Sequence, residues 1–96
     1  MPDEKPEVVP DIYCNAVQMG ISPYDLMIEL QRVSPSQGGE EKPLLVGRIR
    51  MSLEHAKVFA IVLQRTLRSY EDEIKGAIPV HPNVLQELGI SKAEDW

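Results

Sequence analysis

The chain carries few side chains that do chemistry, and their spacing does not bring them together. Its two histidines, His55 and His81, fall in different predicted elements, and Cys14 is the single cysteine. Proton transfer needs a histidine beside a carboxylate in a cleft, and a zinc site needs several His or Cys ligands at short spacing. We therefore predict no catalytic residue, no metal site and no cofactor, and we expect that the protein is not an enzyme.

The remaining polar groupings favour structural roles. Gly38 and Gly39 are not followed by the Lys-Ser/Thr pair of a phosphate-binding loop. The acidic residues 71–73 are expected on the solvated side of a helix. One combination stays open, because a small-ligand site could be built around His55, Tyr24 and Asp25 if the fold places them in a buried polar pocket.

Composition excludes several functional classes. The 96 residues suffice for one domain with a modest core. The net charge of −5 and the lack of a Lys/Arg cluster argue against nucleic-acid binding. No apolar run approaches membrane-spanning length, so we expect no membrane partner. The acidic, proline-rich first ten residues do not resemble a secretory signal, and with a lone cysteine this indicates a reducing, cytoplasmic compartment.

The longest predicted element is a helix over residues 52–76. Ser52 is a candidate N-cap, and Gly76 is expected to take the left-handed conformation that ends a helix. One apolar stripe has helical spacing and predicts core packing: Ala56, Ala60, Leu63, Leu67, Tyr70 and Ile74. Val58, Ile61 and Val62 lie outside that stripe, so we expect a second cover over them, supplied by another subunit or by the C-terminal segment.

Three strands are predicted before the helix, over residues 13–19, 26–33 and 44–51. Clean alternation of apolar and polar residues supports the second strand, and a Ser-Pro-Tyr-Asp turn precedes it. The glycine- and proline-rich residues 34–43 predict an exposed, mobile loop. The fold class is α+β: a three-stranded antiparallel meander followed by one long helix (β-β-β-α) laid across it, and a C-terminal tail with an extended part and a short helix.

The expected organisation is a disordered tail over 1–10, a β-β-β-α domain over 11–78 and a docking segment over 79–96. The docking segment predicts a short helix over 82–88 that Gly89 stops. Its apolar residues are too many for a solvated tail, so it should dock on its own chain, on a neighbouring subunit or in a groove of another protein. The predicted interface residues are Val58, Ile61, Val62, Leu85, Leu88 and Trp96.

Several short patterns resemble a known family. They are Tyr13-x-Asn15-x-x-Gln18, then Ser22-Pro23-Tyr24-Asp25, then Arg48-Ile49-x-Met51-Ser52-x-x-His55-Ala56-Lys57, then a helix ending in Tyr70-Glu71. The resemblance is to short bacterial and archaeal proteins catalogued as a domain of unknown function, and it covers residues 12–78. It implies no activity. The order of meander and helix is also similar to one half of the SecB-type export chaperones, an analogy of topology alone.

These observations favour a non-enzymatic protein-interaction module that forms a homo-oligomer, with a dimer favoured. The C-terminal tail offers a further contact for another protein. The alternatives are a chaperone-like protein that binds clients through an apolar groove, and a small-ligand binder. The sequence names no cellular process.

Overall fold

A computed structural model describes residues 8–34 and 42–96, which divide into two units between Ala56 and Lys57. Each unit is described by itself. The tail predicted over the first residues falls largely on 1–7, and the loop predicted as mobile falls largely on 35–41. Both stretches lie outside the described residues.

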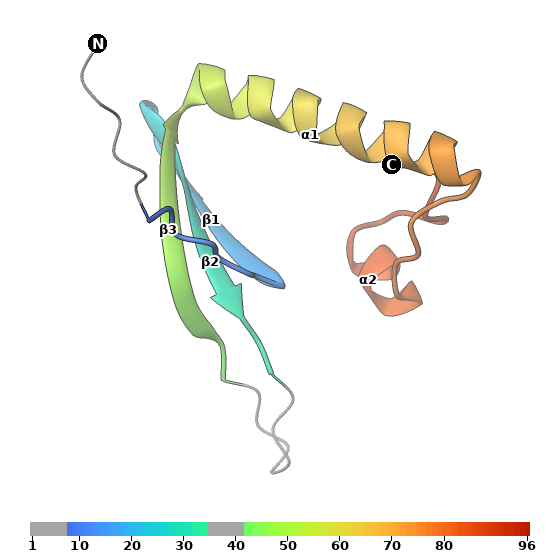
Figure 1. Ribbon diagram of the computed structural model, residues 1–96, viewed down its shortest axis with the longest axis horizontal. Coiled ribbons are helices and arrows are strands. Elements are labelled where there is room, and N and C mark those ends of the chain that lie inside the picture. Colours follow the sequence, from blue (N-terminus) through green and yellow to red (C-terminus); the bar gives the residue numbers. More distant parts are fainter. Residues whose placement is uncertain (1–7, 35–41) are drawn as a thin grey trace. The chain divides into compact units, whose positions relative to one another are not determined.

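The first unit holds a three-stranded antiparallel sheet in the order β1-β2-β3 (Figure 1). The strands are β1 (Ala16–Ile21), β2 (Asp25–Arg32) and β3 (Leu44–Ser52). The tight turn before β2 forms as its residues predict, because the Ser22 hydroxyl accepts hydrogen bonds from the backbone N–H groups of Tyr24 and Asp25, at 3.2 and 3.1 Å. The predicted meander is therefore confirmed.

β1 begins three residues later than predicted. Asn15, just before it, donates its backbone N–H to the Gln31 carbonyl at 3.0 Å and also bonds through its side chain. Its amide nitrogen donates to the Val33 carbonyl at 2.9 Å, and its amide oxygen accepts from the Val33 N–H at 2.8 Å. The side chain therefore ties the start of β1 to the end of β2, and the regular ladder starts at Ala16 opposite Gln31.

The register divides the sheet into one apolar and one polar face. Residues opposite each other in a ladder lie on the same face. We call the apolar side the apolar sheet face, and it consists of Val17, Met19, Ile21, Leu26, Ile28, Leu30, Ile49 and Met51. On the other face Arg48 pairs with Glu29 at 2.9 Å. Ile28, in the central strand, is 7% exposed and is the one buried residue in the described part of the chain.

A register shift in β3 changes the alternation expected from sequence. Leu30 lies opposite Gly47, but the next residue, Gln31, lies opposite Leu45, so Val46 is bulged out of the ladder. Strict alternation would put Leu45 on the face of Gly47, whereas the bulge pairs it with Gln31. The missing side chain of Gly47 leaves room for Ile12, because a Cβ there would lie 2.9 Å from the Ile12 Cδ1 atom.

The long helix α1 (Leu53–Ile74) begins as predicted and ends differently. The Ser52 hydroxyl accepts from the His55 backbone N–H at 3.2 Å, which confirms Ser52 as the N-cap. At the other end Lys75, with φ 58°, takes the left-handed conformation that was expected of Gly76. The N–H groups of Lys75 and Gly76 donate to the carbonyls of Asp72 and Glu71, which is a Schellman ending with Lys75 in the left-handed position.

The segment after α1 turns back to the helix and forms α2 (Pro82–Glu87). The His81 ring accepts from the Asn83 N–H at 3.1 Å and caps this helix. Gly89, with φ 70°, ends it as predicted. The fold class is therefore α+β, with three antiparallel strands, a long helix and a short C-terminal helix. That the long helix lies across the sheet stays a prediction.

Within the described ranges, no helix combines the length and the apolar character needed to cross a membrane.

Candidate interaction site

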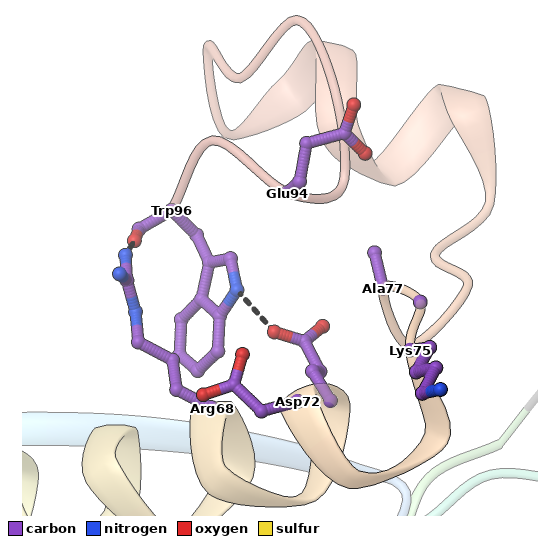
Figure 2. A pocket seen from close by; sticks show the side chains of 8 residues that line it. Arg68, Asp72, Lys75, Ala77, Glu94 and Trp96 are labelled. Carbon is purple, nitrogen blue, oxygen red and sulfur yellow. Dashed lines mark hydrogen bonds between the residues drawn. The ribbon is translucent and has the colours of Figure 1, made fainter.

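The polar contacts of the second unit, Lys57–Trp96, converge on Glu71 of α1. One carboxylate oxygen accepts the Ile78 backbone N–H at 2.7 Å, and the other accepts the Trp96 indole N–H at 3.2 Å (Figure 2). Both oxygens are thus engaged by the segment that follows the helix. A carboxylate bonded in this way fixes both ends of that segment to one turn of α1.

Two further side chains of α1 hold Trp96 from the other side. The Arg68 guanidinium lies 5.3 Å from the centroid of the indole ring and also donates to the Trp96 carbonyl oxygen. Gln64 donates to the same carbonyl at 3.3 Å. Gln64, Arg68 and Glu71 are spaced four and three residues apart and share one side of the helix. We call these three residues the tail anchor.

Two hollows flank the tail anchor, and Glu71 and Trp96 line both. One, of about 250 Å³, has apolar walls apart from Glu71. The other, of about 400 Å³, has charged walls that include Arg68, Lys75 and Glu94 (Figure 2). The apolar hollow presents almost no polar surface that could orient a ligand. The apolar hollow is therefore suited to apolar packing rather than to selective recognition.

The predicted interface residues divide into two sets. Leu85 and Trp96 are half-buried and line the apolar hollow, so both contribute to docking of the C-terminal segment on its own chain. Leu88 also borders that hollow but is 64% exposed. The other three keep close to half of their surface exposed: Val58 49%, Ile61 44% and Val62 54%.

The docked segment covers only one side of α1. Successive residues of an α-helix are about 100° apart, so Val62 lies about 180° and Val58 about 140° from Glu71 around the axis. These two side chains therefore lie away from the tail anchor. The sequence analysis expected either another subunit or the C-terminal segment to cover these two valines. The C-terminal segment docks elsewhere on the helix.

The residues of the postulated ligand site serve local structure. Asp25 lies opposite Ser52 in the β2–β3 ladder, so the register brings the two to the same end of the sheet. The Asp25 carboxylate, however, accepts from the Ser22 hydroxyl at 3.0 Å, and Ser52 caps α1 through the backbone of His55. Tyr24 is 85% exposed, which is incompatible with a buried pocket around its hydroxyl.

The other candidate residues for chemistry belong to different units. Cys14 is a free, half-buried thiol, and His81 caps α2. No three His, Cys, Asp or Glu side chains lie close enough to hold a metal ion in the part of the chain that the structure describes.

The tail anchor is the part of the site that sequence reasoning missed. Glu71 was expected on a solvated acidic face, but it is half-buried under the C-terminal segment, whereas Asp72 and Glu73 are exposed. The available signal was the helical spacing of Gln64, Arg68 and Glu71 together with a lone tryptophan beyond the helix. That signal does not say which polar residues a distant tryptophan meets.

The comparisons with known proteins identify a family but no activity. A family model described as "Protein of unknown function (DUF3467)" matches residues 3–78. Neither a curated protein nor a solved structure gives a significant match. The C-terminal segment that carries α2 and Trp96 lies beyond the matched residues.

Proposed function

We propose, from the premise that the chain belongs to the DUF3467 family of unknown function, that it is a non-enzymatic protein-interaction module. It self-associates through the side of α1 that carries Val58, Ile61 and Val62, and a dimer is the favoured state. The lone cysteine and the acidic composition support a reducing, cytoplasmic setting.

One observation carries this proposal: the chain's own C-terminal segment occupies the tail anchor and does not cover the side of α1 that carries Val58 and Val62. Full burial of a valine or isoleucine side chain contributes about 1.5–3 kcal/mol. Three neighbouring side chains that are about half exposed thus leave a few kcal/mol of apolar burial unused. An adjacent apolar patch of this kind is typical of a protein contact.

A second copy is the simplest partner for this side of α1. A twofold axis places the same patch against itself, so apolar residues of one protomer meet apolar residues of its partner. The predicted interface residues Leu85 and Trp96 contribute indirectly, because they hold the C-terminal segment on the other side of the helix.

The test measures molar mass by size-exclusion chromatography with light scattering at micromolar concentration. The α1 contact alone gives twice the 10.8 kDa chain mass, so we expect the wild type to have at least that mass. Val62→Glu should shift the mass toward the monomer, because burying an unpaired carboxylate in an apolar contact costs several kcal/mol. Each 1.4 kcal/mol raises Kd about tenfold, so Kd should rise by about two orders of magnitude or more.

The matched control is Val84→Glu, which makes the same change at a valine of similar exposure in α2. It should leave the mass unchanged. A monomeric wild type, or equal effects of the two substitutions, would contradict the proposal.

Chaperone-like client binding is the second candidate, and the exposed residues of the apolar sheet face favour it. Val17, Met19 and Ile21 are all classed as exposed in β1. A client-binding protein should bind an apolar dye or an unfolded protein while folded, and the bound client should protect these three residues. An interaction module whose apolar patches close within its own oligomer should bind neither.

A further inference from the structure

The free edge of β1 lacks the features by which sheet edges avoid pairing. Natural edge strands carry charges, prolines or bulges that block a further strand. The stretch Ala16–Ile21 contains neither a charged residue nor a proline, and its register with β2 runs without a shift. Among the described residues β1 has β2 as its one neighbour. Its outer edge is thus open to another strand.

The outward backbone groups of β1 belong to its apolar residues. The Ser22 N–H donates to the Asp25 carbonyl at 2.9 Å, and inward and outward groups alternate along an antiparallel strand. The even-numbered residues of β1 therefore point their N–H and C=O groups at β2. Val17, Met19 and Ile21 point theirs outward, where they have the spacing that a second antiparallel strand requires.

We propose that β1 pairs antiparallel with β1 of a second copy, about a twofold axis at Met19, and joins two sheets into one of six strands. In this register the Val17 position of one protomer faces Ile21 of its partner, and Met19 faces Met19. The three outward residues of each protomer then form hydrogen-bonded pairs with those of its partner.

The pairing register follows from which face each residue occupies. Opposed residues share a face, and a shift by one residue would place the two apolar sheet faces on opposite sides of the joint sheet. Only registers that oppose odd-numbered residues keep both apolar faces together. When the twofold axis passes through Met19, all three outward residues of β1 (Ala16–Ile21) form hydrogen bonds to the partner strand.

Charge explains why the partner is a second copy and why β1 is the edge. β1 is uncharged, so two copies meet without repulsion. At the opposite edge, the outward groups of β3 belong to Arg48 and Arg50 by the same alternation, because Ile49 lies opposite Ile28 and faces β2. Pairing β3 with itself would oppose like charges, and the bulge at Val46 further interrupts that edge.

This contact is additional to the one proposed on α1, and it rests on the proposed self-association. A backbone-specific test compares Met19→Pro with Met19→Ala by light scattering. Proline removes the outward N–H at the axis, and it is tolerated where the N–H does not serve the strand's own sheet. Alanine keeps the N–H and removes the side chain. We expect Met19→Pro to halve the molar mass and Met19→Ala to leave it unchanged.

Cross-linking gives a readout that does not depend on disrupting the strand. In a Cys14→Ser background, Met19→Cys places two cysteines across the axis with Cα atoms about 5.5 Å apart, a separation a disulfide can span. Met51→Cys, on the same face at the β3 edge, is the matched control. Oxidation should yield a covalent dimer from Met19→Cys and none from Met51→Cys.

The outcomes separate the two proposals. If Met19→Pro, shown to be folded by circular dichroism, keeps the wild-type mass and Met19→Cys does not cross-link, the β1 contact is wrong while the α1 contact stands. If Met19→Pro halves the mass and Val62→Glu does not lower it, the α1 contact is wrong and the β1 contact stands. A wild-type monomer overturns both.

Discussion

At the scale of single residues, Glu71 decides where the C-terminal segment lies. Its two oxygens accept from groups on either side of α2, the Ile78 N–H and the Trp96 indole. Hydrogen bonds to a charged group contribute about 1.5–3 kcal/mol each, more than a neutral pair. Because Trp96 is the one tryptophan of the chain, its fluorescence reports this docking directly.

We predict that Glu71→Gln loosens the C-terminal segment. The amide keeps one acceptor oxygen, so one of the two hydrogen bonds and the charge are lost, at a cost of about 1–3 kcal/mol. The Trp96 emission should move to longer wavelength, and the midpoint of urea unfolding followed by that emission should fall. Asp72→Asn is the control, because this neighbouring carboxylate lines the charged hollow and makes no hydrogen bond to the segment. Unchanged emission in Glu71→Gln would contradict the anchor.

At the scale of elements, the end of α1 has a strained backbone conformation that a single substitution can relieve. Lys75 holds φ 58°, a conformation that costs a residue with a Cβ atom about 1 kcal/mol and costs glycine almost nothing. We predict that Lys75→Gly stabilises the protein by about 0.5–1 kcal/mol. The melting temperature should rise by a few degrees, since about 1 kcal/mol corresponds to 4–8 °C in a domain of this size. Circular dichroism at 222 nm, which follows helix content, measures it.

Two controls isolate the left-handed position from the loss of the lysine charge. Lys75→Ala removes the charge and keeps the Cβ atom, so it should bring no gain. Gly76→Ala should be nearly neutral, because a Cβ at Gly76 meets no atom within 4 Å. A melting temperature of Lys75→Gly equal to that of Lys75→Ala would show that the conformation carries no cost.

At the scale of the whole molecule, we infer from the shortage of buried side chains that folding is coupled to the proposed association. Ile28 alone is buried among the described residues. A chain of this size needs a core that outweighs the loss of chain entropy, and a second copy can supply the missing burial. If both contacts are made, apolar residues of the sheet and of α1 become buried together when the oligomer forms.

We therefore predict that thermal stability depends on protein concentration. Association that stabilises the folded state raises the free energy of unfolding by about 2.7 kcal/mol when the partner is present at 100 times Kd. The melting temperature of the wild type should rise over a hundredfold increase in concentration. Val62→Glu should show a smaller rise than Val84→Glu. A melting temperature independent of concentration in the wild type would contradict coupled folding and association.

The helices and strands could be predicted from the amino-acid sequence because the signals for them are local. Alternation in residues 26–33 defined the central strand to within one residue of Asp25–Arg32. Ser52 and Gly89 marked a helix start and a helix end through hydrogen bonds and backbone conformation that involve neighbours in the chain. The order of these elements indicated the α+β class. The resemblance of short residue patterns to a known family covers residues 12–78, inside the matched 3–78.

The contacts between residues far apart in the sequence could not be predicted and are seen only in the folded chain. The Asn15 side chain bonds to Val33 across 18 positions of sequence, and the bulge at Val46 moved Leu45 out of simple alternation. The left-handed residue is Lys75 because α1 ends one residue earlier than its glycine suggests. Glu71 contacts Trp96, which lies 25 positions later in the sequence. Helical spacing predicts on which side of α1 a residue lies, but it does not predict which segment packs against that side. Which side of α1 the C-terminal segment covers therefore follows from chain folding and not from the sequence pattern.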